Sequence, residues 1–185
     1  MEDKTIEKVD FSIEELETNY YECTFDKCNF SDKPIGRVIF EKCTFKECNL
    51  SLVKTSNTSW LDVLFTDCKM TGINFSLSNR FGLSVEFHNC LLSYALFTEM
   101  KLKGTRFIGC DLQNTDFMET DLSNAVFKDC DLCYASFHHT NLEKADFTTA
   151  RNYALNAAAN RLKKAKFSRY GLEGLLTGLG IEVVD

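Results

Sequence analysis

A large aromatic or aliphatic side chain returns at almost every fifth residue between Cys23 and Phe147, and a small residue lies two places before it. A helix has a period of 3.6 residues and a simple strand has a period of 2, so neither can place this series on one face. The spacing therefore predicts another regular coil, in which every fifth residue points inward.

The series is interrupted once. It runs from Phe25 to Phe75 with a lapse at Thr55, then resumes two residues late at Phe87 and continues without a break to Phe147. We therefore predict a two-residue insertion within residues 78–84.

A 20-residue period is superimposed on the five-residue one. Six cysteines and seven phenylalanines form two series whose steps are 20 residues, or 22 across the insertion. The predicted core ladders are Cys28, Cys48, Cys68, Cys90, Cys110 and Cys130, and Phe25, Phe45, Phe65, Phe87, Phe107, Phe127 and Phe147. Twenty residues in steps of five make one turn with four sides.

Self-similarity at this period is typical of a solenoid, in which each repeat buries its apolar face against its neighbours. We predict an all-β solenoid, a parallel β-helix of about seven coils over residues 21–167. At about 4.8 Å per coil, its length would be on the order of 35 Å. The 185 residues fit one folding unit.

Several pentads match one motif, a small residue followed by Asp or Asn and then Leu or Phe. Examples are Cys110-Asp111-Leu112, Thr115-Asp116-Phe117, Thr120-Asp121-Leu122 and Ala145-Asp146-Phe147. The chain thereby resembles the pentapeptide-repeat family over about two thirds of its length. The resemblance implies a right-handed quadrilateral β-helix.

The nine cysteines are interpreted mainly as core residues. Parallel Cβ vectors hold stacked cysteines slightly too far apart for disulfides, so a reduced, buried ladder is expected. Cys130 and Cys133 have the spacing of half a zinc site, but they should point in opposite directions and have no second pair. We expect no metal, no cofactor and no catalytic site, because packing explains the repeated positions.

Charge and hydropathy suggest a cytoplasmic protein. The net charge is −6, and no apolar run approaches a membrane span. The N-terminus lacks the basic and apolar blocks of a signal peptide. We expect no membrane contact and no direct contact with nucleic acid.

The N-terminal part raises two structural questions. Residues 1–20 are predicted to be a cap, either a short helix begun by the capping-box spacing of Ser12 and Glu15 or a distorted first coil. Pro34 lacks an N–H and Lys33 occupies a small inward position. We expect that side of the first coil to be distorted or looped out.

Residues 168–185 are predicted to form a C-terminal module. Ser168 is a good N-cap for a short α-helix with leucines on one face, and Gly180 would end it. The module either caps the last coil or forms a homodimer contact with a terminal strand. The candidate dimer residues are Leu172, Leu175, Leu176, Leu179, Ile181 and Val183.

The stretch from Ala165 to Val183 is similar to the C-terminal helix and Leu-Gly-Ile strand of quinolone-resistance members of the family. Asn19 to Phe25 and Asn160-Arg161-Leu162 resemble microcin-immunity members. The resemblance implies a tail-to-tail dimer that binds DNA gyrase or another topoisomerase as a DNA mimic, giving immunity or drug protection. Quinolone-resistance members carry long projecting loops, whereas this chain has only its two-residue insertion.

Two functional hypotheses remain open. One is a topoisomerase-binding protein, and the other is an interaction scaffold with a different protein partner. The candidate partner residues are outward acids and tyrosines, namely Asp67, Glu99, Glu119, Asp129, Tyr94 and Tyr134. Leu52, Leu91 and Tyr153 are expected to lie with the two tyrosines in one outward patch.

Overall fold

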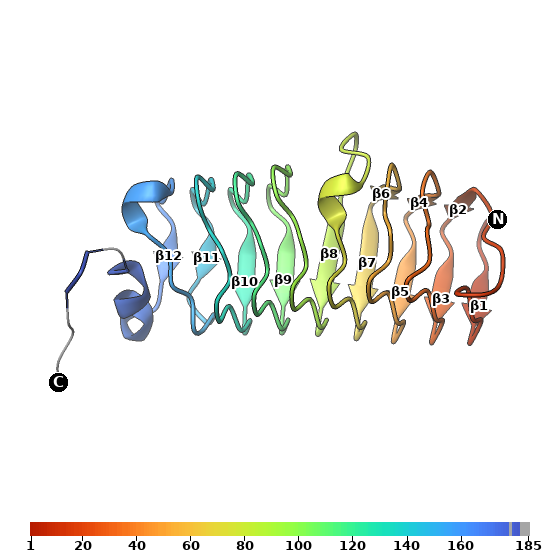
Figure 1. Cartoon of the computed structure of the whole chain (residues 1–185), viewed down its shortest axis with the longest axis horizontal. Coiled ribbons are helices and arrows are strands. Elements are labelled where there is room, and N and C mark those ends of the chain that lie inside the picture. Colours follow the sequence, from red (N-terminus) through yellow and green to blue (C-terminus); the bar gives the residue numbers. More distant parts are fainter. Residues whose placement is uncertain (178, 182–185) are drawn as a thin grey trace.

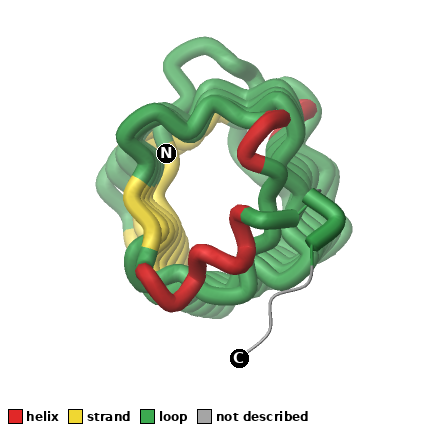
Figure 2. Tube along the Cα trace, turned by 90° about the vertical axis from the view of Figure 1, so that its left-hand side faces the viewer, coloured by secondary structure: helices red, strands yellow, loops and turns green. Residues whose placement is uncertain are grey.

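A computed structural model describes residues 1–177 and 179–181. The chain winds into a rod of stacked coils, with residues 1–20 at one end and residues 168–177 at the other (Figure 1). About eight turns are present, one more than predicted, because residues 1–20 also form a coil. The prediction of a four-sided parallel β-helix is confirmed, and the end-on view shows the sides stacked in register (Figure 2).

One face of the rod carries a nine-stranded parallel sheet. We call it the first face and number the other faces in the order in which each coil passes through them. The strands of the first face are β1 (Thr5–Glu7), β3 (Thr24–Asp26), β5 (Thr44–Lys46), β7 (Val63–Thr66), β8 (Val85–His88), β9 (Arg106–Ile108), β10 (Val126–Lys128), β11 (Asp146–Phe147) and β12 (Lys166–Phe167).

The fourth face carries a shorter parallel sheet near the N-terminus. Its strands are β2 (Asn19–Tyr21), β4 (Ile39–Glu41) and β6 (Ser59–Leu61). In the described part of the chain, three 3₁₀-helices complete the regular structure, namely η1 (Phe75–Leu77), η2 (Ala157–Ala159) and η3 (Arg169–Leu175). The second and third faces are joined from coil to coil by isolated parallel bridges.

The predicted phenylalanine ladder forms the centre of the core. Phe107 and Phe127 are stacked with ring centroids 5.1 Å apart, and Phe97 and Phe117 repeat this geometry on the third face at 5.3 Å. Rings on the opposite first and third faces meet edge to face in the centre of the coil, as between Phe107 and Phe117. Each ring therefore has both stacked and edge-on partners, which are geometries that aromatic pairs favour.

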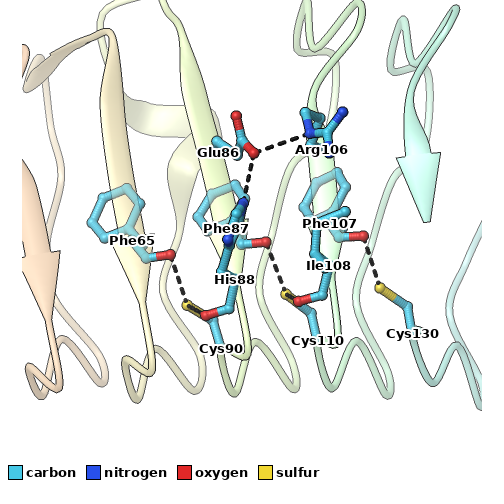
Figure 3. A network of polar contacts seen from close by, with 10 residues as sticks. All are labelled: Phe65, Glu86, Phe87, His88, Cys90, Arg106, Phe107, Ile108, Cys110 and Cys130. Atoms are coloured by element: carbon cyan, nitrogen blue, oxygen red, sulfur yellow. Dashed lines mark hydrogen bonds and ion pairs between the residues drawn. The ribbon is translucent and has the colours of Figure 1, made fainter. Parts of the chain in front are cut away.

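The cysteine ladder has a second role besides packing. Each thiol of the ladder donates a hydrogen bond to the carbonyl of the inward first-face residue one coil earlier, as Cys110 Sγ does to Phe87 O at 3.4 Å and Cys130 Sγ to Phe107 O at 3.2 Å (Figure 3). On the third face, Thr115 makes the equivalent bond to Leu92 O. Small donors at this inward position thus satisfy buried carbonyls that point along the rod.

The structure holds all nine cysteines as free thiols, with Cys133 alone half-exposed and the others buried. Burial raises the pKa of the Cys43 thiol to about 11. Neighbouring thiols in the ladder, together with burial, raise the pKa of Cys28 and Cys90. The thiols of Cys28, Cys43 and Cys90 are therefore protonated at neutral pH.

An exposed loop interrupts the fourth face at residues 80–83. The chain leaves the fourth face after Asn79, whose N–H donates to Thr58 O, and returns at Ser84, whose N–H donates to Trp60 O. Phe81 sits in this loop and is 87% exposed. Trp60 lies beneath it, stacked on Phe40 and donating to Ser78 Oγ at 3.1 Å.

The structure answers both N-terminal questions. Residues 1–20 form a distorted coil rather than a helix, since Ile6 pairs with Phe25 at a spacing one residue short of 20 and Asp10, not Ser12, caps the turn that follows.

The expectation of a looped-out Pro34 is wrong: Ile35 is fully buried and Pro34 bridges Lys54. A proline fits because its missing N–H would face the irregular first coil, where the ladder is already broken.

The C-terminal helix differs from the prediction in type and length. It is a 3₁₀-helix that ends at Leu175, well before Gly180, although Ser168 caps it by accepting a hydrogen bond from Tyr170 N. Its glycines disfavour a regular α-helix, so contacts with the last coil determine its form. Ile181 is not in a strand, and Val183 lies outside the described residues.

Core substitutions should cost far more than substitutions in the insertion loop. Phe107→Ala removes a ring with partners above, below and beside it, so we expect it to lower the free energy of unfolding by about 3–5 kcal/mol. Phe81→Ala is the matched control and should change it by less than about 0.5 kcal/mol. Guanidinium unfolding followed by Trp60 fluorescence measures both, and similar losses in the two variants would contradict the description of the core.

Thiol accessibility tests the cysteine ladder. In native protein at pH 8, a thiol reagent such as DTNB should react rapidly at one position only, Cys133, because the other thiols are buried and those with a raised pKa stay protonated. All nine should react after unfolding. Cys133→Ser should abolish the rapid phase, and rapid reaction of several thiols in that variant would show that the ladder is open.

Candidate interaction surfaces

Four edges, where neighbouring faces of the rod meet, present outward side chains that a partner could contact. At each regular corner, the residue two places after the inward residue has a positive φ, from 52° to 74° among corners such as Lys42 and Gly104. Asn, Asp and Gly adopt this left-handed conformation most readily. Side chains at the corners point away from the rod, so each edge presents one residue per coil to a partner.

We name each edge after the side chains that characterise it. The aspartate edge, between the first and second faces, holds Asp67 and Asp129, and the tyrosine edge, between the second and third, holds Tyr94 and Tyr134. The glutamate edge follows with Glu99 and Glu119, and the lysine edge, between the fourth and first faces, holds Lys144 and Lys164.

The tyrosine edge is unusual in carrying bulky apolar residues at left-handed positions. Leu52, Tyr94 and Tyr134 have φ values of 58°, 61° and 59°. For a residue with a Cβ, this conformation costs roughly 1–2 kcal/mol. All three side chains are nonetheless largely exposed, so packing does not repay that cost within the monomer.

Neighbouring residues extend the tyrosine edge into a patch. Leu91 and Leu96 are exposed on either side of Tyr94, on the second and third faces. Gly72 occupies the corner between Leu52 and Tyr94, and a Cβ at Gly72 would lie 2.8 Å from Leu52 Cδ2. Leu52 therefore lies across the glycine, and the apolar surface continues over the coil between Leu52 and Tyr94.

One predicted member of this patch was placed wrongly. Tyr153 is buried and packs against Phe147 and Phe167. After Ala150 the chain departs from the regular pentad, so a residue expected to point outward turns into the core instead. The sequence signal that was missed is the loss of a large residue at the expected inward position, Asn152.

The candidate acids do not form one surface. Asp67 and Asp129 share the aspartate edge but lie three coils apart, whereas Glu99 and Glu119 are on adjacent coils of the glutamate edge. In the four-sided cross-section these two edges are diagonally opposite (Figure 2). A single flat partner could not contact both pairs at once.

Ion pairs between coils interrupt the negative charge along the rod. Glu86 accepts from Arg106 Nε at 3.0 Å and lies 2.6 Å from His88 Nε2 (Figure 3). Arg80 lies 3.4 Å from Glu99, and Glu143 lies 2.8 Å from Arg161. A continuous negative stripe resembling a DNA duplex would require these acids to be unpaired.

The C-terminal module is held by close backbone contact with Tyr153. A Cβ at Gly171 would lie 2.1 Å from Tyr153 Oη, and one at Gly174 would lie 2.1 Å from Tyr153 O. Leu155 N–H donates to Gly174 O at 2.8 Å, which ties η3 to the last coil. The glycines that weaken the helix are therefore needed for this approach.

The predicted dimer residues divide into two groups. Leu175 packs against the core and Leu176 is half-buried, so both contribute to the cap. Leu172, Leu179 and Ile181 are exposed by 48%, 63% and 56%. The module thus caps the last coil with one side and presents an apolar surface with the other.

Among residues 1–177 and 179–181, no three His, Cys, Asp or Glu side chains gather as a metal site would need. Cys130 is buried while Cys133 is half-exposed, so the two point apart. None of the helices in the described part of the chain is long and apolar enough to cross a bilayer.

Comparison with solved structures gives several pentapeptide-repeat proteins of similar architecture. Two trypsin-treated variants of QnrB1, a plasmid-mediated fluoroquinolone resistance protein, are 23% and 26% identical, with TM-scores of 0.48 and 0.43. The alignments cover 98% and 100% of this chain and 99% and 91% of those chains. HetL, involved in heterocyst differentiation regulation in Nostoc sp. strain PCC 7120, is 16% identical over 90% of this chain and 84% of its own, with a TM-score of 0.47.

No curated protein matches the chain. The family model described as "Pentapeptide repeat region" matches residues 18–97 and 100–175. These two segments cover nearly all of the coils whose inward ladders, hydrogen-bonded corners and 20-residue register are described above. The chain belongs to the pentapeptide-repeat family.

Proposed function

We propose that the protein acts without catalysis, by binding a protein partner along the tyrosine edge. The observation that carries this proposal is the exposure of Leu52, Tyr94 and Tyr134 at left-handed positions. The fold imposes a positive φ at every regular corner but does not require a bulky apolar residue there, so these residue types at the tyrosine edge support a role in binding. Tyrosine is also a frequent anchor of protein interfaces, because it buries a large area at low entropic cost.

DNA gyrase, or another topoisomerase, is the first partner that we propose. The supporting facts are the family membership of the chain and the name of one relative, a fluoroquinolone resistance protein. The rod shape suits an elongated cleft. DNA mimicry by charge is the weaker part of this proposal, because ion pairs such as Arg106–Glu86 neutralise acids on the rod.

The second candidate is an interaction scaffold whose partner is a different protein. The apolar character of the tyrosine edge favours it, because a cleft built for DNA is lined by cations rather than by apolar pockets. Both candidates use the same edge and differ in the partner, so one set of variants tests them together.

The C-terminal module is proposed to form a two-fold homodimer. Leu172, Leu179 and Ile181 present exposed apolar side chains at the C-terminal end of the rod. An exposed apolar cluster at the end of a rod is suited to a self-complementary contact. The two solenoids would then join tail to tail into a rod of twice the length.

Replacing the edge tyrosines should separate stability from binding. Tyr94→Asn with Tyr134→Asn places a residue that tolerates positive φ at both corners, so we expect the free energy of unfolding to rise by about 1 kcal/mol or more. Partner binding should fall at least about tenfold, because exposed interface tyrosines are removed. Guanidinium unfolding measures the first effect and purified-gyrase binding and supercoiling assays with and without a quinolone measure the second.

Leu77→Ser is the control, since Leu77 is also exposed but lies on the glutamate edge. Absence of gyrase binding, inhibition and protection at micromolar wild-type protein would reject the topoisomerase proposal. Protection that persists in the stabilised double variant would reject the tyrosine edge as the contact.

Light scattering tests the dimer. The wild-type protein should have twice the 21.1 kDa mass of one chain. Leu172→Asp places a charge in the proposed contact and should give the monomer mass. Leu52→Asp introduces the same charge at a similarly exposed leucine far from the C-terminus and should leave the mass unchanged. A monomeric wild-type protein would leave η3 as a cap alone.

A further inference from the structure

The charge of the rod is strongly uneven along its axis. Residues 107–126 contain four acids and no bases, whereas residues 147–172 contain six bases and no acids. At the other end, residues 1–20 contain seven acids and two bases. The net charge of −6 therefore conceals a cationic C-terminal end.

Five of these bases follow one another around the last coil, and with Lys144 they form what we call the basic band. Arg161 and Lys163 lie on the fourth face, and Lys164 occupies the lysine edge. Lys166 follows on β12, and Arg169 begins η3. Lys144 adjoins the band one coil earlier, where its N–H donates to Lys163 O.

Most of the band is free to bind an anion. Arg161 pairs with Glu143 and Lys166 with Asp146, yet their side chains remain 68% and 66% exposed. The other four cations, Lys144, Lys163, Lys164 and Arg169, are exposed. None of them has a carboxylate of the described residues within 4.0 Å. About four uncompensated cations thus surround the lysine edge.

An aromatic side chain continues the band. Tyr170 follows Arg169 at the start of η3 and is 97% exposed. An exposed aromatic ring beside cationic side chains provides a surface on which a nucleic-acid base can stack. Arg and Lys with an exposed aromatic are the combination by which proteins bind single strands without reading their sequence.

We infer that the basic band binds the phosphate backbone of single-stranded nucleic acid, with Tyr170 stacking on a base. The shape of the band favours a flexible chain over a membrane. Its cations occupy two faces that meet at the lysine edge, so a strand can follow them around the corner, whereas a flat bilayer would contact one face only. The expectation of no nucleic-acid contact rests on overall charge, which averages over this separation.

A fluorescent 20-nucleotide single strand and the full-length protein test the inference by anisotropy. With about four phosphates contacted, the logarithm of the association constant should fall with the logarithm of salt concentration with a slope of about −3. Lys163→Ala with Lys164→Ala should weaken binding at least about tenfold and reduce the slope by about 1.4. Lys101→Ala with Lys103→Ala, an equal charge change on the same face three coils away, should have little effect.

Tyr170→Ala separates stacking from charge. It should weaken binding about fivefold or more and leave the salt slope unchanged, because no cation is lost. Inorganic polyphosphate and phosphatidylserine vesicles serve as competing ligands. The inference is overturned if the single strand does not bind at 50 mM salt, or if the two double-lysine variants lose equal affinity for it. It is also overturned if Tyr170→Ala has no effect and polyphosphate binds as tightly as the single strand, or if the protein binds only the vesicles. None of these outcomes depends on gyrase, so the proposed function is tested separately.

Discussion

The stacking of each coil on the next is the interaction on which the rest of the structure depends. A coil of 20 residues has strands of only two to four residues, too short to be stable alone. Ring on ring contact along the first face, such as Phe87 on Phe107 at 5.2 Å, fixes the register at the same time as the ladder hydrogen bonds. Because both interactions repeat along one direction, the molecule is a rod, and its core extends along the whole axis.

The same repetition determines where function can lie. Two of every five positions are committed to the core, and the inward Cys and Thr residues also satisfy carbonyls of the preceding coil. The side chains at the three outward positions neither fill the core nor satisfy buried carbonyls. Their residue types can therefore vary, provided that the residue at the corner can adopt a positive φ. The fold is therefore compatible with the bulky residues of the tyrosine edge and the cations of the lysine edge, but its stability does not require them.

Much of the fold was predictable because the core pattern is local and periodic. The predicted Phe and Cys ladders and the predicted insertion follow from counting residues. In the structure Phe107 pairs with Phe127, and the chain leaves the fourth face after Asn79. The count fails where the period fails. Tyr153 turns inward after the pentads lapse, and η3 ends early because Gly171 and Gly174 must approach Tyr153 closely. Pro34 is accommodated because its neighbour on one side is an irregular coil, which no local pattern around Pro34 reveals.

The sequence by itself determined the period, the inward ladders and the position of the interruption, since each depends only on the spacing of apolar residues. The tertiary structure decided which outward residues share an edge, because that depends on how four faces close into a coil. Asp67 and Glu99 were grouped by charge but lie on opposite edges, whereas Lys144 and Lys164 are distant in sequence and adjacent in space. Residues that are 20 positions apart in the sequence lie on adjacent coils, about 4.8 Å apart in space. Electrostatic and apolar interactions depend on this distance in space and not on the separation in the sequence.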